Sequence, residues 1–292
     1  MKVGISTYSF HKCNPPISIY EILDKIKEIG AEYVDFIHEL KKEGCNITIE
    51  MATDIRAYMD KIGLKTACFC PDTEFFGPEG PEGAKDIIIN TWLPIAKVLG
   101  APILRFDLTY KGMPASEKDR SYDRLIELIT PAIREIADAA EAMGIRVCTE
   151  NHGRIHQDPA RTEKLINTVS HKNFGALVDM GNFTGVDGNH TQCVSLLAHR
   201  AFHVHAKDHF IRNGMMDDPG RGYSTTRGFN YVRSTIVGHG NVPVKPCLKI
   251  LKNAGYKGCV TIEFEGIEDP IMANTIGFEN LTRYLKEIDA LS

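Results

Sequence analysis

Short apolar runs alternate with longer amphipathic stretches from one end of the chain to the other. Each apolar run has the length and composition of a strand buried on both faces, as in a parallel sheet. The expected strands lie at residues 3–6, 33–36, 64–70, 102–106, 145–150, 174–179, 201–208 and 259–263. The hydrophobic pattern therefore predicts eight strands.

The stretches between these runs have the period of an α-helix. In residues 18–30, for example, isoleucine and leucine recur on one face, and Gly30 follows the last of them, as is typical of a helix end. The expected helices cover 18–30, 49–63, 84–100, 122–143, 159–169, 193–197, 244–255 and 271–291. Pro94 should bend the third helix. Residues 208–244, which are rich in glycine and arginine, are expected to form a long loop after the seventh strand.

Eight strands, each followed by a helix, indicate a (β/α)8 barrel, an α/β fold that a chain of 292 residues is long enough to form. The alternative is a doubly wound open sheet. That fold usually has a glycine-rich phosphate loop after its first strand, but here the sequence reads STYSFHKCN. No linker or change of composition divides the chain, so we expect a single domain over residues 1–292.

Net charge and cysteine pattern indicate which partners and which cellular compartment to expect. The formal net charge is −4 and the pI about 6.3, which gives no general attraction to nucleic acid or to an anionic membrane. No signal peptide precedes the first strand, and no apolar stretch approaches membrane-spanning length. The eight cysteines form no CxxC pair. They are expected to be reduced, in a cytoplasmic protein.

Polar side chains that can bind metal follow the last four predicted strands. These are Glu150 in CTENHG, Asp179 in LVDMGN, His205 in HVHAKD and Glu263 in TIEFEG. In a (β/α)8 barrel the carboxyl ends of the strands meet at one mouth, where the active site lies. The four side chains are therefore expected to converge despite their separation in sequence.

Three carboxylates and one imidazole at one mouth would repel one another and lose hydration unless a dication neutralises them. A single carboxylate at a strand end is more often a helix cap or a solvated group, but four on successive strands favour a metal site. Hard oxygen ligands with one nitrogen suit Mn²⁺ or Mg²⁺, with two coordination positions left for substrate oxygens.

These segments resemble the xylose isomerase-like barrel superfamily, in particular its sugar phosphate isomerase/epimerase group. That group includes ketose 3-epimerases and inosose dehydratases and, more distantly, endonuclease IV. The resemblance covers the whole chain and is strongest from Val147 onward, through CTENHG, ALVDMGN, VHAKD, GHGNVPVKPCLKILKNAGYKG and IEFEG. It implies one divalent metal, most commonly Mn²⁺ with Mg²⁺, Co²⁺ or Zn²⁺ as alternatives, bound by Glu150, Asp179, His205 and Glu263. It also implies that Glu150 and Glu263 are the catalytic acid/base pair.

Two departures from the group bear on the assignment. Ketose 3-epimerases commonly have a histidine three residues after the metal-binding aspartate, where this chain has Asn182, which can hydrogen-bond a hydroxyl but cannot carry a proton. The three-metal site of endonuclease IV needs further histidines on the second to fourth strands. Here the third strand ends in Cys68-Phe69-Cys70 and the fourth in Arg105-Phe106-Asp107.

The expected activity is that of a sugar isomerase or epimerase in carbohydrate metabolism, which removes a proton next to a carbonyl through a metal-stabilised enediolate. The same intermediate can lose a hydroxyl or an aglycone, so a lyase acting on a keto-sugar, an inosose or an oxidised glycoside is the alternative. A non-catalytic sugar-binding barrel is a third alternative. The partner is expected to be a small sugar or polyol, and members of the group often form homo-oligomers.

Further polar residues near the predicted mouth are candidates for substrate binding. They are Arg105, His152, Asn182, Lys207, Arg227, His239 and Glu265. Arg227 and His239 belong to the long predicted loop, where they could equally anchor that loop to the barrel. Glu265 is expected to pair with an arginine of the loop or to contact substrate. His203 is expected to be a core histidine rather than a ligand.

Overall fold

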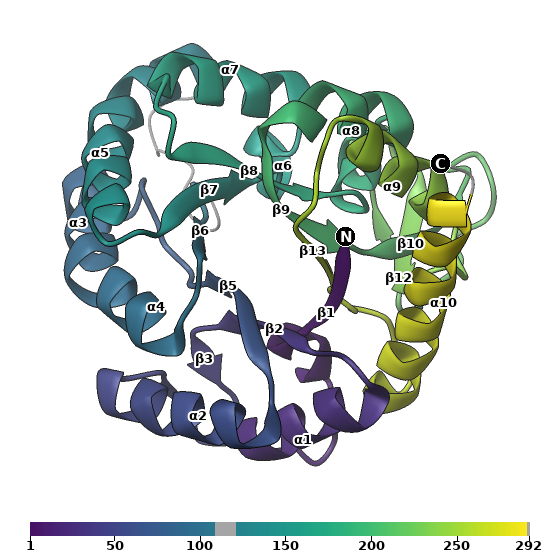
Figure 1. Cartoon of the computed structure of the whole chain (residues 1–292). Helices are drawn as coiled ribbons and strands as arrows, with labels where there is room; N and C mark the ends of the chain where they lie inside the picture. The colour runs from purple at the N-terminus through teal and green to yellow at the C-terminus, as the bar shows by residue number, and fades with distance from the viewer. Residues whose placement is uncertain (109–120, 291–292) are drawn as a thin grey trace.

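Eight parallel strands close into a barrel, and helices surround it as an outer ring (Figure 1). The computed structural model describes residues 1–108 and 121–290. The barrel strands in chain order are β1 (Lys2–Ser6), β2 (Tyr33–Ile37), β5 (Lys65–Cys70), β6 (Ile103–Phe106), β7 (Arg146–Glu150), β8 (Phe174–Asp179), β9 (Ala201–Ala206) and β13 (Cys259–Ile262). Strand β1 pairs with both β2 and β13, which closes the barrel. The predicted (β/α)8 fold is confirmed.

The helices follow the strands as the periodic stretches predicted. They are α1 (Ile19–Ile29), α2 (Ile49–Ile62), α3 (Gly80–Ile87), α4 (Leu93–Leu99), α5 (Tyr122–Ala142), α6 (Gly153–His156), α7 (Pro159–Val169), α8 (His190–Leu197), α9 (Val244–Asn253) and α10 (Pro270–Ala290). The local sequence sets the ends of α1. Ser18 and Glu21 form a reciprocal capping box at its start, and Gly30 closes it in the left-handed conformation with φ of 101°. No helix of the described residues is long and apolar enough to cross a membrane.

The segment predicted as one helix over residues 84–100 is helical, but it begins at Gly80 and is not a uniform α-helix. The structure has α3, then one π-helical turn (Ile88–Trp92), then α4. Pro94 has no N–H to donate to the carbonyl four residues earlier. Just before it, the N–H of Leu93 bonds to the carbonyl of Ile88, five residues back. The helix therefore widens by one residue instead of only bending at the proline.

Residues 208–244 are not the structureless loop that the sequence predicted. They contain a three-stranded antiparallel sheet with the order β10 (Asp208–Arg212), β12 (Tyr231–Thr235) and β11 (Ser224–Thr225), which lies outside the ring of barrel strands (Figure 1). Most residues of β10 and β12 are half-buried, so no apolar run marks them in the sequence. A short hairpin of β3 (Glu39–Leu40) and β4 (Cys45–Asn46) was also not predicted.

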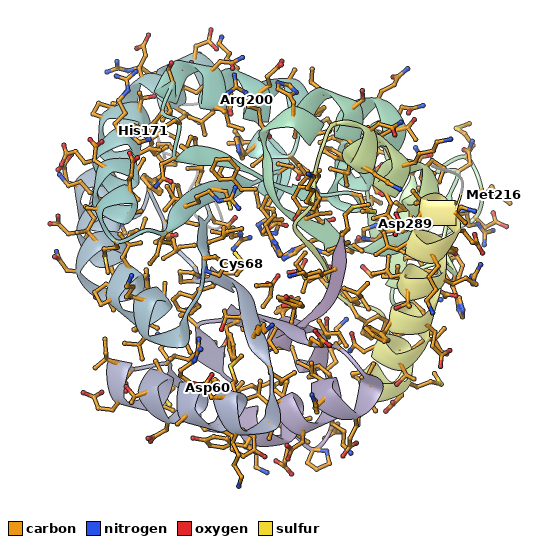
Figure 2. The ribbon with its side chains drawn as sticks, in the orientation of Figure 1. Asp60, Cys68, His171, Arg200, Met216 and Asp289 are labelled. Carbon is orange, nitrogen blue, oxygen red and sulfur yellow. The ribbon has the colours of Figure 1, made fainter. Side chains whose placement is uncertain are left out.

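The barrel strands place alternate side chains inside and outside. On β5, Cys68 packs inside the barrel with Cys148 and Leu177, whereas Phe69 joins the larger core between strands and helices. Cys68 lies within the ring of strands, and polar residues such as Asp60 and His171 lie at the periphery of the molecule (Figure 2). All eight cysteines are free thiols, as the sequence predicted, and all but Cys45 are buried.

Candidate metal centre

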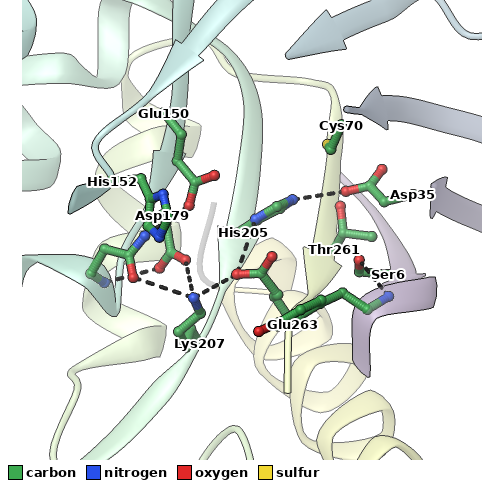
Figure 3. Close-up of polar contacts among 12 residues, drawn as sticks. Ser6, Asp35, Cys70, Glu150, His152, Asp179, His205, Lys207, Thr261 and Glu263 are labelled. Atoms are coloured by element: carbon green, nitrogen blue, oxygen red, sulfur yellow. Dashed lines mark hydrogen bonds and ion pairs between the residues drawn. The ribbon is translucent and has the colours of Figure 1, made fainter. Parts of the chain in front are cut away.

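Four side chains from neighbouring strands meet at the carboxyl end of the barrel. Strand β7 contributes Glu150, β8 Asp179 and β9 His205, and Glu263 follows β13 directly. Each can offer one ligand atom such that all four atoms lie within 4.8 Å of one another. The register explains this meeting, because Asp179 pairs with His205 across the sheet and His205 pairs with Thr261, two residues before Glu263. Figure 3 shows the four carboxylate and imidazole groups turned toward a common space.

The free atoms of this cluster suit a divalent cation. Asp179 uses Oδ1 to accept hydrogen bonds from the backbone N–H groups of Gly181 and Asn182, at 2.7 and 3.0 Å. Its Oδ2 and the Nδ1 of His205 are buried without a hydrogen-bond partner. Three carboxylates with one imidazole are a hard, mostly oxygen donor set that matches Mn²⁺ or Mg²⁺. The residues present therefore fit the metal that the sequence implied.

Lys207 lies beside this cluster, two residues past His205 on the same side of the chain. Its Nζ is 2.6 Å from Glu263 Oε2 and 3.3 Å from Asp179 Oδ2 (Figure 3). It is also 3.3 Å from Glu265 Oε1. Burial lowers the pKa of this ammonium, but the three carboxylates outweigh burial and hold the pKa well above its ordinary value. The same contacts keep the pKa of Glu263 well below its usual range, although burial raises it. Glu263 is thus an ionised carboxylate.

Beneath the cluster, Asp35 of β2 joins two histidines of β9. Asp35 Oδ2 lies 2.9 Å from His205 Nε2 and 2.8 Å from His203 Nε2, and Thr261 Oγ1 is 2.6 Å from His203 Nε2. Asp35, His203 and His205 are almost completely buried. With its Nε2 facing Asp35, His205 directs Nδ1 toward Glu263, 3.6 Å away, and the other ligands. His203 is a core residue, as the sequence predicted.

A second ionic network holds Glu150. Arg105 contacts both Asp107 and Glu150 through one guanidinium nitrogen. Asn182 donates a 2.7 Å hydrogen bond to the other oxygen of Glu150. His152 Nδ1 is 3.1 Å from Asp107 Oδ2. Burial lowers the pKa of His152, but Asp107 outweighs burial and raises the pKa to about 9, so this imidazole is protonated at neutral pH. The predicted residues Arg105, His152 and Asn182 are therefore brought to the centre.

A cavity of about 290 Å³, here called the metal-facing cavity, opens above these groups. Of the predicted residues, its lining includes Arg105, Glu150, His152, Lys207, Glu263 and Glu265. The other predicted substrate contacts lie elsewhere. Arg227 is half-exposed, with Nη1 3.8 Å from Asp158 Oδ2, and His239 is exposed and does not line this cavity.

Of the two contacts expected for Glu265, an arginine of the long segment or the substrate, the arginine pair is absent among the described residues. The cation beside Glu265 is Lys207, and Arg233 of β12 instead lies 3.4 Å from Glu268. Glu265 still differs from Glu263 as expected, because it does not belong to the four-residue cluster.

Sequence reasoning missed Asp35 and Asp107 as parts of the site. A signal for Asp35 was available, because a carboxylate stands in the middle of the apolar run YVDF. Such a residue can be buried only if it is paired. For Asp107 the signal was its place directly after the strand ILRF.

Comparison with known proteins agrees with the geometry. A family model described as xylose isomerase-like TIM barrel matches residues 23–290. An inosose dehydratase of Serratia proteamaculans is 28% identical over 185 residues, 61% of this chain and 60% of that protein. One from Klebsiella pneumoniae is 30% identical over 154 residues, 51% of this chain and 50% of that protein. The matches thus span about half to three fifths of these curated relatives.

Solved structures share the fold. A xylose isomerase-like TIM barrel protein of Mycobacterium smegmatis, in complex with magnesium, has a TM-score of 0.74 and 15% sequence identity, with 98% of this chain and 97% of that chain covered. A xylose isomerase domain protein of Planctomyces limnophilus has a TM-score of 0.72 and 18% identity, with 99% and 97% covered.

Proposed function

Because the chain belongs to the xylose isomerase-like TIM barrel family, we propose that it is a divalent-metal-dependent enzyme acting on a sugar or polyol. The reaction would be removal and return of a proton next to a carbonyl, as in a sugar isomerase or epimerase. The observation that supports this most is the meeting of Glu150 and Glu263 with Asp179 and His205 around one space, below a cavity of sugar size. This arrangement gives two carboxylates to move protons and a donor set for one metal ion.

Glu150, Asp179, His205 and Glu263 would hold the metal, with Mn²⁺ the first choice and Mg²⁺, Co²⁺ or Zn²⁺ as alternatives. When bound, a dication there would stabilise the negative charge that develops on the substrate as its proton leaves. Among the fold neighbours, one structure contains magnesium and another zinc, which supports a metal role without choosing the ion.

Glu263 is the proposed base, because its depressed pKa keeps it ionised beside Lys207. Delivery of a proton to the opposite face through Glu150 would invert the carbon, which is epimerisation. Return of the proton from Glu263 to the neighbouring carbon would be isomerisation. Arg105 and Asn182 orient Glu150 through its two oxygens for this role.

Lys207 and His152 are proposed to contact substrate hydroxyls within the metal-facing cavity, with Glu265 accepting a further hydroxyl. Asn182 and Arg105 would lie at the edge of these substrate contacts. We also propose that Arg227 and His239 contact the outer part of a larger substrate. The acidic net charge supports a small-molecule partner rather than nucleic acid or a membrane surface. The free cysteines support a cytoplasmic location. Family habit supports a homo-oligomer.

A dehydratase is the second candidate, and the curated relatives favour it, because the two described above are both named inosose dehydratases. The first step would be the same proton removal by Glu263. A hydroxyl on the next carbon would then leave with a proton, and protonated His152 or Lys207 could supply it. The fate of the intermediate decides between the two candidates.

Proton NMR in D₂O tests the shared first step and separates the outcomes. Mn²⁺-loaded protein is incubated with a panel of keto-sugars and inososes. Deuterium entering next to the carbonyl, with an epimer or isomer as product, supports the first candidate, whereas a product that has lost water supports the second. Replacing Glu263 with Gln should slow either reaction by at least about 100-fold, because the base is lost. Glu279→Gln, on an exposed face of α10, is the matched control. No exchange and no elimination with any substrate would contradict the proposal.

A further inference from the structure

A second cavity adjoins the metal-facing cavity. Its volume is about 420 Å³, and its lining comes from the sheet β10–β12–β11 and from segments at the barrel mouth. We call it the sheet-side cavity. Glu265 lines both cavities. Asn182, which also lines the sheet-side cavity, bonds to Glu150 and accepts a hydrogen bond from Lys207. The two spaces therefore meet at groups that contact the metal cluster.

The register of the three-stranded sheet shows which side chains face this cavity. His209 on β10 pairs with Ser234 on β12, and Ser224 on β11 pairs with Val232. Directly opposed residues of an antiparallel pair point to the same face, and every second residue of a strand shares that face. All four of these residues line the cavity. Four residues that share one face of this sheet thus form part of the wall, and Thr225 and Arg233 at the alternate positions add to it.

The lining has the chemistry of a site for hydroxyl groups. Hydroxyls of Ser224, Thr225 and Ser234 and the amide of Gln157 supply both donors and acceptors, beside the apolar edge of Val232. Its cations already have partners in the protein. Lys12 donates to the carbonyls of Glu265 and Gly266, and the Arg233 guanidinium lies over the ring of Phe210 and pairs with Glu268. An uncharged, hydroxyl-rich group fits this surface better than an anion.

The volumes of the two cavities also favour a second sugar unit. Ligand pockets commonly measure about 300–1,000 Å³, so the metal-facing cavity alone lies at the lower limit and the adjoining space is the larger one. We propose that the sheet-side cavity is a subsite for a second sugar unit, so that the substrate is a disaccharide or similar glycoside whose keto-sugar unit faces the metal cluster. This inference rests on the proposed function, because only that function places the reacting unit in the metal-facing cavity.

Equilibrium binding to the full chain with Mn²⁺ tests the subsite without depending on turnover. The probes are D-fructose and the ketose disaccharides lactulose, turanose, leucrose and isomaltulose, which join a second sugar to fructose through different hydroxyls. At least one disaccharide should bind about tenfold more tightly than D-fructose, because it fills both cavities. Val232→Trp, which fills the sheet-side cavity, should reduce this ratio to about twofold or less with little change for D-fructose.

Two further variants make the experiment decisive. Ser224→Trp, at an exposed position of the same wall, repeats the test if Val232→Trp does not fold. Leu128→Trp, which adds the same ring at an exposed position of α5 away from both cavities, should leave the disaccharide preference unchanged.

The subsite is overturned if no disaccharide gains affinity, or if the gain survives both tryptophan variants at the wall. It is also overturned as a sugar site if an O-benzyl ether of fructose gains more affinity than any disaccharide. Deuterium exchange, measured on the same samples, keeps the two proposals apart. If deuterium exchanges into D-fructose but no disaccharide binds more tightly than D-fructose, the proposed function stands and the subsite is ruled out. A gain that depends on Val232, without exchange or elimination in any sugar, supports the subsite and counts against the proposed function.

Discussion

At the scale of single residues, Glu263 and Glu265 share a cavity but have different neighbours. Glu263 belongs to the four-residue cluster with His205, whereas Glu265 contacts Lys207 at its edge. Glu263→Ala should weaken Mn²⁺ binding by more than about 100-fold, because a ligand is lost, and Glu265→Ala by no more than about threefold. Calorimetric titration of both variants checks this. Equal losses of Mn²⁺ affinity in the two variants would show that Glu263 and Glu265 have the same role.

Asp35 should act on the metal through His205. Its carboxylate holds His205 Nε2 and leaves Nδ1 toward the ligands, so Asp35→Asn should weaken Mn²⁺ binding by about 10–100-fold without removing a ligand. Asp24→Asn, on α1, is the matched control, since this carboxylate accepts from Tyr58 far from the cluster. Competition with a chelator measures both. Unchanged affinity in Asp35→Asn would mean that the barrel alone orients the imidazole.

At the scale of elements, Asp208 attaches the extra sheet to the barrel. Its buried carboxylate accepts hydrogen bonds from the backbone N–H groups of His209, Gly238, Gly240 and Val242. In Asp208→Asn, an amide N–H₂ would face some of these donors, so the free energy of unfolding should fall by about 2–3 kcal/mol. Urea unfolding measures this. Asp218→Asn is the control, because that exposed carboxylate bonds only locally to Gly220. Equal losses would contradict this role.

The barrel strands and the four cluster residues could be predicted because each follows a local rule. Apolar runs mark strands buried on both faces, and the carboxyl ends of parallel strands meet at one mouth. The sheet of β10, β12 and β11 follows no such rule, since its strands are mostly half-exposed or exposed and form neither an apolar run nor a regular alternation. The π-helical turn before Pro94 was missed because sequence period does not distinguish a bend from an inserted residue.

Contacts between residues far apart in the chain were the other feature that could not be predicted from the sequence. Asp35 and His203 are 168 residues apart, and Lys207, which follows β9, contacts Glu265, which follows β13. Nothing in the local pattern around Asp35 names its partner. The sequence predicted which side chains lie at the carboxyl end of the barrel. Which of them contact one another depends on how the closed sheet brings the strands together.

At the scale of the whole molecule, buried neutral histidines should limit stability in acid. His156 is buried beside Tyr122, and burial lowers the pKa of its imidazole to about 3. Below pH 6.5 the unfolded chain binds a proton at this histidine that the folded chain does not. The free energy of unfolding should therefore fall by about 1.4 kcal/mol per pH unit from this group, until the pH approaches 3.

Urea unfolding of the wild type and of His156→Gln between pH 7 and pH 4 checks this linkage. The free energy of unfolding of the variant should fall less steeply with decreasing pH than that of the wild type, by about 1.4 kcal/mol per pH unit. This difference in slope does not depend on the stability of the variant at neutral pH. Parallel curves would mean that His156 is protonated in the folded protein.

Among residues 1–108 and 121–290, the barrel brings together two groups that could hold a metal ion, and the proposed function needs only one of them. One is Glu150, Asp179, His205 and Glu263, and the other is Asp35, His203 and His205. An anomalous difference map from crystals grown with Mn²⁺ distinguishes them directly. The account predicts one peak among Glu150, Asp179, His205 Nδ1 and Glu263, with Lys207 moved away from Glu263. A peak between Asp35 and His203, or no peak at the mouth, would contradict it.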